Sequence, residues 1–477
     1  MTSKNSVGNV VKLLSGPLLF LLIWLLGPFD HFQNATLGVA IWMIFWWTTQ
    51  VLPIGVTALL PMILFPAMGI DSIENVTVNY ANPIIYLFFG GFVLGLALEK
   101  WNLHQRLALN ILRISGTRPR NIIAGSMLAT AIMSMWISNT AATMMMLPIG
   151  LSIVALIENQ LKANREKRHF ALCLLLGLAF SANVGGMATL IGTPPNLVLA
   201  ALVSESMGVE IGFSEWFLFA FPISAILFFA ILQINVRLVF PVKNDSLKDL
   251  SQMISQKIQL LGKPGAGEIK VFLVFLSTAL LWIFRAPLST IESLSFLSDP
   301  LIAVLAAVSL FAIPSGEGRQ LLTWEDTRYL PWDILLLFGG GLSLAAGLES
   351  SGVVQLLGNA ITAFQGIHWL LVVLLITFMA VFLTEGMSNV ALVSVFIPIA
   401  IIIAPSLGGS GIELAIPLTL GASCAFMLPI ATPPNAIVFA SNKITIAEMA
   451  RTGFIINVFA TIFIALYCYY LVPRFFG

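Results

Sequence analysis

The sequence predicts an all-α polytopic membrane protein of about 11 spans with two re-entrant hairpins, arranged as an inverted repeat. Three observations support this fold class: the composition, the succession of apolar runs, and polar motifs that occur twice at a nearly constant spacing. Of the 477 residues, 58% are hydrophobic and 9% are charged, whereas a soluble domain carries about 25% charged residues. Soluble enzymes are therefore excluded, and a net charge of +1 gives no basic surface for nucleic acid.

The apolar runs define the expected elements in order along the chain. The first run, 16–29, follows a short polar lead and lacks an A-x-A-like exit, so we expect a retained span rather than a cleaved signal. Runs of this kind are typical of membrane-spanning helices. The later runs cover residues 36–50, 54–69, 83–98, 121–149, 170–201, 216–240, 271–286, 300–313, 331–348, 368–404, 413–440 and 453–473.

Four of these runs contain polar or proline interruptions. The interruption in 121–149 is Ser138-Asn139-Thr140, and the interruption in 368–404 is Ser388-Asn389-Val390. We expect each of these two runs to fold back on itself as a hairpin. The run after each of them is interrupted by a Thr-Pro-Pro-Asn sequence. Because proline lacks a backbone donor and blocks the helical hydrogen bond, we expect two broken helices there.

Lysine and arginine residues indicate the orientation, because cytoplasmic loops retain them. With the N-terminus inside and both hairpins returning to their own side, only Arg285 and Arg474 of the 23 Lys and Arg residues fall outside. If either interrupted run crossed the membrane, the basic loops after it would move to the outer face. The charge distribution therefore favours two hairpins, a cytoplasmic N-terminus and an outer C-terminus, in the plasma membrane.

The two halves of the chain repeat the same landmarks. A shift of 250 positions carries Glu99 onto Glu349 and Asn139 onto Asn389, and the two Thr-Pro-Pro-Asn sequences are 239 positions apart. The expected topology places the first hairpin on the inner side and the second on the outer side, so the halves are inverted. Paired broken helices in inverted repeats form the midplane site of alternating-access transporters.

The interruptions are the candidate site. A broken helix frees carbonyl groups, which together with hydroxyl and amide oxygens suit a small cation such as Na⁺. Helix N-termini offer N–H groups and a charge of about +0.5 to an anion. The four interrupted segments contain no Lys or Arg, so an anionic substrate would depend on helix ends, polar side chains and co-transported cations. We interpret Glu385, beside the second motif, as a brace that accepts backbone N–H groups.

These motifs resemble those of the divalent anion/sodium symporters, which import di- and tricarboxylates or sulfate. The resemblance also includes the Trp46-Trp47 segment and the Thr57-Ala58-Leu59-Leu60-Pro61 run. It implies a small dianionic substrate, Na⁺ as the co-transported ion, and an elevator-type transporter: a homodimer whose scaffold domains dimerise while the transport domains move. The implied substrate contacts are Ser138, Asn139, Thr140, Thr193, Ser388, Asn389, Thr432 and Pro433. The implied sodium contacts are Ser134, Ser138, Asn139, Gly192, Thr384, Met387, Asn389 and Ala431.

The implied division into domains follows the repeat. The scaffold takes residues 1–120 and 216–350, and the second of these segments includes a cytoplasmic linker over 241–270. The transport domain takes 121–215, with the inner hairpin and the first broken helix. It also takes 351–477, with the outer hairpin, the second broken helix and the last span.

The sequence favours sodium-coupled import of C4-dicarboxylates such as succinate, malate and fumarate. Two alternatives stay open: a sodium-independent di- or tricarboxylate exchanger, and a sulfate/sodium symporter. Val390 stands where the first motif has Thr140, so one hydroxyl is missing and the size of the substrate stays open. The sequence has no nucleophile with its base, no aspartate pair and no HExxH helix, so we do not expect an enzyme.

Overall fold

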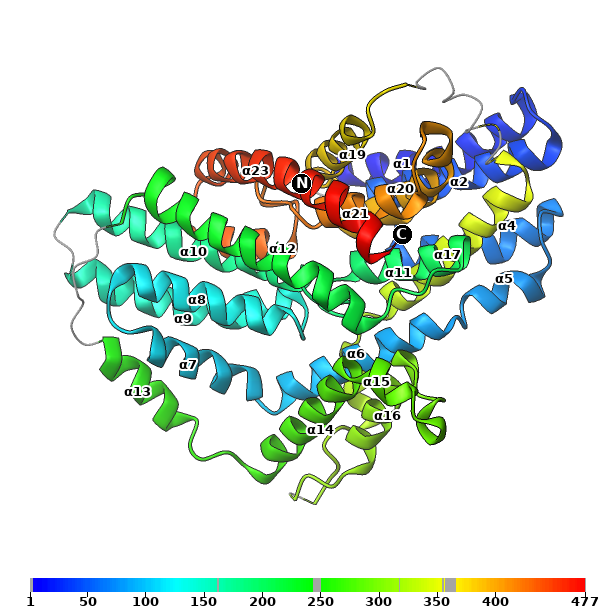
Figure 1. The fold of residues 1–477 in the computed structure, drawn as a ribbon. Helices are drawn as coiled ribbons and strands as arrows, with labels where there is room; N and C mark the ends of the chain where they lie inside the picture. Colours follow the sequence, from blue (N-terminus) through cyan, green and yellow to red (C-terminus); the bar gives the residue numbers. More distant parts are fainter. Residues whose placement is uncertain are drawn as a thin grey trace.

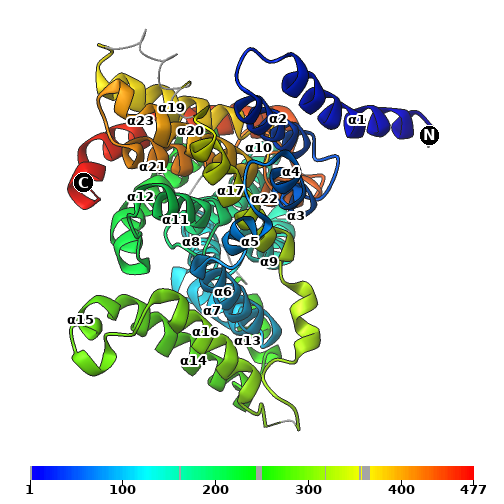
Figure 2. The ribbon, with the colours of Figure 1, turned by 90° about the vertical axis from the view of Figure 1, so that its right-hand side faces the viewer.

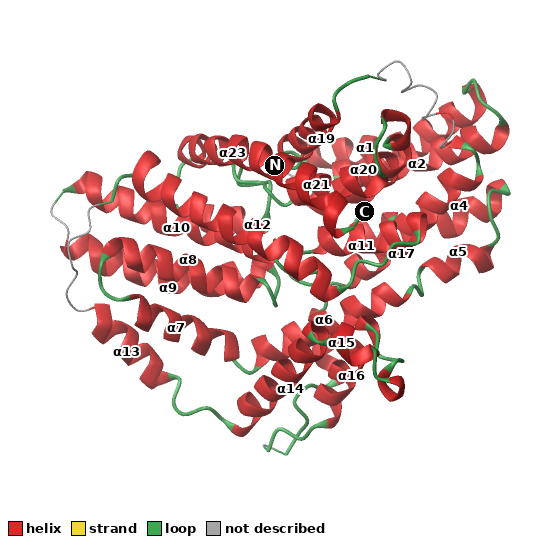
Figure 3. Ribbon diagram, in the orientation of Figure 1, coloured by secondary structure: helices red, strands yellow, loops and turns green. Residues whose placement is uncertain are grey.

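The computed structural model describes residues 3–160, 163–242, 250–316, 318–353, 356 and 366–476. Within these ranges the chain consists of helices joined by loops, with one isolated bridge between Pro314 and Gln320 (Figures 1 and 3). The predicted all-α class is confirmed.

The N-terminal region forms six helices. Asp30 caps the second of them, since its side chain accepts a hydrogen bond from the Gln33 backbone N–H at 2.9 Å. The expected run 54–69 forms two short helices rather than one, and Pro61 lies in the first turn of the second, where the missing N–H costs least. The bounds are α1 Ser3–Leu26, α2 His31–Thr49, α3 Ile54–Thr57, α4 Leu60–Met68, α5 Ile73–Asn79 and α6 Pro83–Lys100.

The next part of the chain contains the first two interrupted runs. The polar cluster Ser138-Asn139 separates α8 from α9, and the segment before Pro194 separates α10 from α11, as the sequence predicted. Helix α12 continues into a π-helical turn, η1. The bounds are α7 Leu103–Ser115, α8 Pro119–Ser134, α9 Asn139–Gln160, α10 Asn164–Met187, α11 Pro194–Met207, α12 Phe213–Gln233 and η1 Ile234–Val239.

The remaining part of the chain repeats this order after a group of connecting helices. Residues 243–249 of the expected linker 241–270 lie outside the described residues. The connecting helices are α13 Leu250–Leu260, α14 Ala266–Ile283, α15 Arg285–Ser289, η2 Glu292–Leu294, α16 Asp299–Ala312, η3 Trp324–Tyr329 and α17 Trp332–Ser350. The second interrupted runs form α19 Trp369–Leu383, α20 Asn389–Ile403, η5 Pro405–Leu407, α21 Gly411–Ala422 and α22 Pro433–Phe439, and the described chain ends with α23 Ile446–Phe475.

The helix lengths support a multi-pass membrane protein. Among the described residues, eight helices are long and apolar enough to cross a membrane, judged by length and composition. Several other apolar helices are shorter, including both arms of the second hairpin, α19 and α20, which have 15 residues each. A helix of that length extends about 22 Å, less than the roughly 30 Å of a bilayer core.

Helix α10 lies at the centre of the first hairpin region. Every residue from Phe170 to Met187 is buried, and the helix contacts α8, α9, α12 and α22. In contrast, α1 extends from the edge of the molecule in Figure 2 and packs mainly on α2. The broken helix that carries the first Thr-Pro-Pro-Asn sequence is therefore held by packing on all sides.

Helix α6 packs closely against both the first hairpin and the first break. A Cβ on Gly91 would lie 2.9 Å from the Ile191 side chain, and a Cβ on Gly95 would lie 3.2 Å from the Trp136 carbonyl oxygen. Trp136 belongs to the hairpin turn, and Ile191 belongs to the break after α10. The absence of side chains at these two glycines allows α6 to approach the backbone of the hairpin turn and the Ile191 side chain of the break.

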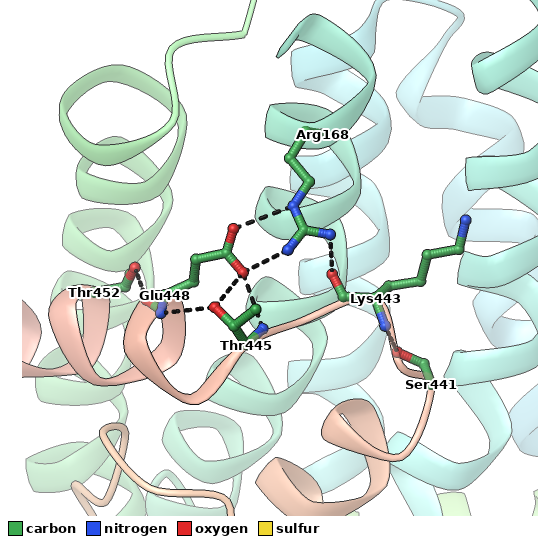
Figure 4. Close-up of polar contacts among 6 residues, drawn as sticks. All are labelled: Arg168, Ser441, Lys443, Thr445, Glu448 and Thr452. Atoms are coloured by element: carbon green, nitrogen blue, oxygen red, sulfur yellow. Dashed lines mark hydrogen bonds and ion pairs between the residues drawn. The ribbon is translucent and has the colours of Figure 1, made fainter. Parts of the chain in front are cut away.

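An ion pair joins the start of α10 to the start of α23 (Figure 4). The Arg168 guanidinium donates to both carboxylate oxygens of Glu448, at 3.1 and 2.6 Å, and to the Lys443 carbonyl oxygen at 2.9 Å. Thr445 caps α23 and donates its hydroxyl to the same carboxylate at 2.7 Å. These contacts hold residues of the two halves of the sequence together at one end of α10.

Candidate functional site

The first motif forms an oxygen-rich centre between the hairpin and α10, which we call the first centre. Ser134, the last residue of α8, is buried, and its Oγ lies 2.6 Å from Asn139 Oδ1 and 2.7 Å from the Ala182 carbonyl oxygen. A hydroxyl carries a single proton, so three oxygen atoms converge on one hydrogen. Such a surplus of oxygen acceptors suits a small cation.

The second motif forms the equivalent arrangement, the second centre. Thr384 is also buried, and its Oγ1 lies 2.7 Å from Asn389 Oδ1 and 2.8 Å from the Ala422 carbonyl oxygen. As in the first centre, a hydroxyl follows the first hairpin arm, an asparagine begins the second, and the carbonyl belongs to the helix before the break. The two halves thus repeat the contacts as well as the motif.

Two glycines bring further backbone to the first centre. A Cβ on Gly192 would lie 2.5 Å from the Gly186 carbonyl oxygen and 3.0 Å from the Ser134 carbonyl oxygen. A Cβ on Gly186 would clash with Asn139 Oδ1. The backbone at Gly192 therefore lies beside Ser134 and Asn139, as the family resemblance implied for a sodium site.

Three other residues implied by the resemblance, Ser138, Met387 and Ala431, have different contacts. Ser138 is exposed, and its Oγ accepts the Ala141 backbone N–H at 3.2 Å, which caps α9. Met387 lies in the turn of the second hairpin, and Ala431 directly precedes Thr432. Among the described residues, no hydrogen bond joins either of them to the second centre.

Hydrogen bonds from nearby residues close the first break. The Thr189 hydroxyl donates to the Met135 carbonyl oxygen at 2.5 Å and accepts the Gly192 backbone N–H at 3.0 Å. The Asn196 amide donates to three carbonyl oxygens, the shortest bond being 2.8 Å to Thr189. Because the break is buried, these bonds offset the cost of its freed backbone groups.

A carboxylate accepts hydrogen bonds from the free backbone N–H groups of the second break. Glu385 Oε1 accepts the Phe426 and Met427 backbone N–H groups, both at 2.8 Å, and Oε2 accepts that of Leu428 at 3.0 Å. The Asn457 amide, from α23, donates to Oε1 at 2.7 Å. Glu385 accepts backbone N–H groups as predicted, but these groups belong to the second break rather than to the hairpin.

The helices that begin at the motifs pack crosswise. Helix α9, which begins at Asn139, contacts α22 of the other half, and α11, which begins at Pro194, contacts α20, which begins at Asn389. Helices α9, α11 and α20 have 22, 14 and 15 residues, enough to carry a helix dipole. Each of these two contacts joins a helix of the first half to a helix of the second half.

The implied substrate residues differ in exposure. Pro433, like Ser138, is exposed, whereas Thr193 and Thr432 are buried. The partly exposed residues of this set are Asn139, Thr140, Ser388 and Asn389. The motif turns are thus partly exposed, whereas the two threonines before Pro-Pro-Asn are covered by the protein.

Sequence reasoning missed three residues of this region: Thr189, Asn183 and Asn457. Each is a buried polar residue in a mostly apolar stretch. A polar residue in an apolar stretch could have indicated them, since buried polar side chains in proteins require hydrogen-bond partners. The partners lie 54, 249 and 72 positions away, at Met135, Thr432 and Glu385.

A helical membrane protein with paired helix-turn-helix motifs, two broken helices and matched oxygen-rich centres is a transporter, not an enzyme. The chain matches the model of the sodium:sulfate symporter transmembrane region over residues 9–472, and it belongs to that family. It is 39% identical to the sodium-dependent dicarboxylate transporter SdcS of Staphylococcus saprophyticus, over 99% of this chain and 93% of the relative. It is 38% identical to SdcS of Staphylococcus aureus strain USA300, over 98% and 92%.

Two solved structures share the fold. The YdaH transporter of Alcanivorax borkumensis matches with a TM-score of 0.57 at 15% identity, over 83% of this chain and 86% of that one. The MtrF protein of Neisseria gonorrhoeae, described as an efflux pump, matches with a TM-score of 0.58 at 12% identity, over 95% and 98%. Both similarities concern the arrangement of helices alone.

Proposed function

We propose that this protein imports small divalent anions, chiefly C4-dicarboxylates such as succinate, malate and fumarate, together with Na⁺. The observation that carries the proposal is the pair of matching oxygen-rich centres in a chain 39% identical to a protein named as a sodium-dependent dicarboxylate transporter. Oxygen-rich breaks bind Na⁺ in transporters of this architecture, and helix N-termini bind anionic groups.

In this proposal the two centres hold cations and the motif turns hold the substrate. Sodium binds at the first centre through Ser134, Asn139 and the Gly192 backbone, and at the second through Thr384 and Asn389. Substrate carboxylates bind at the partly exposed turns and at Thr193 and Thr432. Since no Lys or Arg lies in the four interrupted segments, the cations supply the positive charge that a buried dianion requires. The further residues in the proposed site are Ser138, Thr140, Met387, Ser388, Ala431 and Pro433.

We also propose that the halves form an inverted repeat and that the transport domain moves as an elevator within a homodimer. The two 15-residue arms of the second hairpin support this, because neither is long enough to cross a bilayer alone. In this arrangement 121–215 and 351–477 move, whereas 1–120 and 216–350 form the scaffold. The N-terminus is cytoplasmic and the C-terminus lies outside.

Cysteine labelling tests the proposed inversion. The chain's own cysteines, Cys173, Cys424 and Cys468, are buried, so single cysteines placed near Arg165 and near Gly409 give distinct signals with an impermeant reagent. We expect labelling from opposite sides of oriented vesicles. Labelling of both positions from the same side contradicts the inverted arrangement.

Uptake of labelled succinate into proteoliposomes tests the function. We expect accumulation that requires an inward sodium gradient and proceeds without internal dicarboxylate. An exchanger instead requires internal dicarboxylate and is independent of sodium. Competition by sulfate, compared with competition by malate and fumarate, distinguishes the sulfate symporter from the dicarboxylate symporter.

A further inference from the structure

Asn183 is a buried polar residue of α10 that contacts the second break. Its side-chain Nδ2 lies 3.3 Å from the Ala425 carbonyl oxygen and 3.3 Å from Thr432 Oγ1, and the residue is 1% exposed. Asn183 precedes the first break in the sequence, whereas Ala425 and Thr432 belong to the second. The side chain therefore connects one half of the sequence to the proposed substrate site of the other.

The orientation of the Asn183 amide is determined by its surroundings. A carbonyl oxygen can only accept, so the amide must direct Nδ2, and not Oδ1, toward Ala425. The same carbonyl also accepts the Asn435 amide at 3.1 Å. Asn183 Oδ1 is buried and has no hydrogen-bond partner among the described residues. The contacts of this side chain are thus all donations, and Thr432 receives one of them.

The contacts around Thr432 leave its hydroxyl proton available. Its Oγ1 accepts from Asn183 Nδ2 at 3.3 Å and from the Asn435 backbone N–H at 3.4 Å. A hydroxyl oxygen has two lone pairs and one proton, so these two donors occupy both lone pairs. No acceptor among the described residues takes the proton. Thr432 is thereby set up as a donor, the role that a carboxylate ligand requires.

Among the described residues of the first half, no equivalent of this arrangement is found. Thr193 stands before Pro-Pro-Asn as Thr432 does, but its side chain makes no capping hydrogen bond. The shift of 239 positions between the two Thr-Pro-Pro-Asn sequences carries Asn183 onto Ala422, which has no side-chain donor. The contact between Asn183 and Thr432 is therefore specific to one of the two breaks.

We propose that Asn183 is a positioning residue that orients the Thr432 hydroxyl as a donor to a substrate carboxylate. This inference rests on the proposed function, since it takes Thr432 as part of a dicarboxylate site. It makes α10 of the first half a component of the second substrate contact. It also explains why a polar side chain occupies a helix segment in which every residue from Phe170 to Met187 is buried.

The experiment is sodium-driven succinate uptake by purified full-length variants in proteoliposomes at saturating sodium. Asn183→Ala should raise the KM for succinate about tenfold, because the Thr432 hydroxyl would lose the contact that orients it as a donor to the charged carboxylate, and should change the maximal rate less than about twofold. Ser181→Ala is the matched control, because Ser181 is equally buried on α10 but bonds within its own helix. Asn183→Ser, which keeps a donor, should recover part of the affinity and serves if the alanine variant does not fold.

A double-mutant comparison separates positioning from a general structural role. If Asn183 acts through Thr432, then Asn183→Ala combined with Thr432→Val should have the same KM as Thr432→Val alone. Additive effects, or an unchanged KM in both Asn183 variants, would overturn the inference. Absence of sodium-driven uptake by the unmodified protein would instead refute the proposed function, so the two failures are distinguishable.

Discussion

The two breaks carry the same motif, and its asparagine donates to backbone carbonyl oxygens in both, from Asn196 in the first and from Asn435 in the second, but the other supporting contacts differ. The first, between α10 and α11, is closed by Thr189 and Asn196, which bond to the break itself and to the hairpin turn. The second, between α21 and α22, depends on Glu385 of the second hairpin and Asn457 of α23, and it also contacts Asn183 of the first half. The two Thr-Pro-Pro-Asn breaks are therefore stabilised by different numbers of contacts from other helices. The second break receives more of them than the first.

The largest loss of transport is expected at the two asparagines whose contacts are the same in both halves. Asn139→Ala and Asn389→Ala should each lower sodium-driven uptake about 100-fold or more, because loss of even an outer ligand costs about 10- to 100-fold in metal affinity. Initial rates in proteoliposomes measure this. Asn110→Ala is the control, since the Asn110 side chain bonds to its own helix at the Arg106 carbonyl oxygen.

Size-exclusion chromatography should show that both variants elute like the unmodified protein. If one asparagine variant transported normally, the two halves would not be functionally equivalent. The centre that contains that asparagine would then not be part of the transport site.

The next largest effect is a loss of stability when the contacts of Glu385 with the second break are removed. Glu385→Ala should lower the thermal midpoint of the purified protein markedly, because it leaves three backbone donors and the Asn457 amide without their acceptor. Each buried donor left unpaired costs about 1–3 kcal/mol. Thermal unfolding in detergent measures the change.

The matched control lies at the corresponding position of the first half. The shift of 250 positions carries Met135 onto Glu385, and the Met135 contact to Thr189 uses only its carbonyl oxygen. Met135→Ala should therefore change the midpoint little. Equal losses from Met135→Ala and Glu385→Ala would show that the two breaks have the same support.

A smaller effect is expected from the glycine that is specific to the first centre. Gly192→Ala places a methyl group 2.5 Å from the Gly186 carbonyl oxygen, so the backbone beside Ser134 must shift. The sodium concentration for half-maximal uptake should rise about tenfold, which corresponds to about 1.4 kcal/mol. In Gly341→Ala, the control, the added methyl meets no atom within 4 Å. An unchanged sodium dependence in Gly192→Ala would show that the Gly192 backbone is not part of the cation site.

The features that could be predicted from the sequence have local causes. The paired prolines of the two Thr-Pro-Pro-Asn sequences and the Ser-Asn clusters interrupt helices, so the starts of α9, α11, α20 and α22 could be predicted from residue type. Single prolines such as Pro148 and Pro398 lie inside helices instead. Glu385 was also predictable, because a lone carboxylate in an apolar run must find donors. Thr189 and Asn183 were not, since their partners are determined by how distant helices pack. The division of 54–69 into α3 and α4 likewise was not anticipated.

The central claim is that cations in the two centres compensate the charge of a dianion. Two Na⁺ would balance a dicarboxylate, and a third would move net positive charge inward with each cycle. A membrane potential acts on such net charge with about 2.3 kcal/mol per elementary charge per 100 mV.

The most direct test is succinate uptake into proteoliposomes at a series of sodium concentrations, with and without an inside-negative potassium diffusion potential. We expect the potential to accelerate uptake and the sodium dependence to have a Hill coefficient above one. Uptake that responds to neither sodium nor potential, but requires internal dicarboxylate, would contradict the account and identify an exchanger.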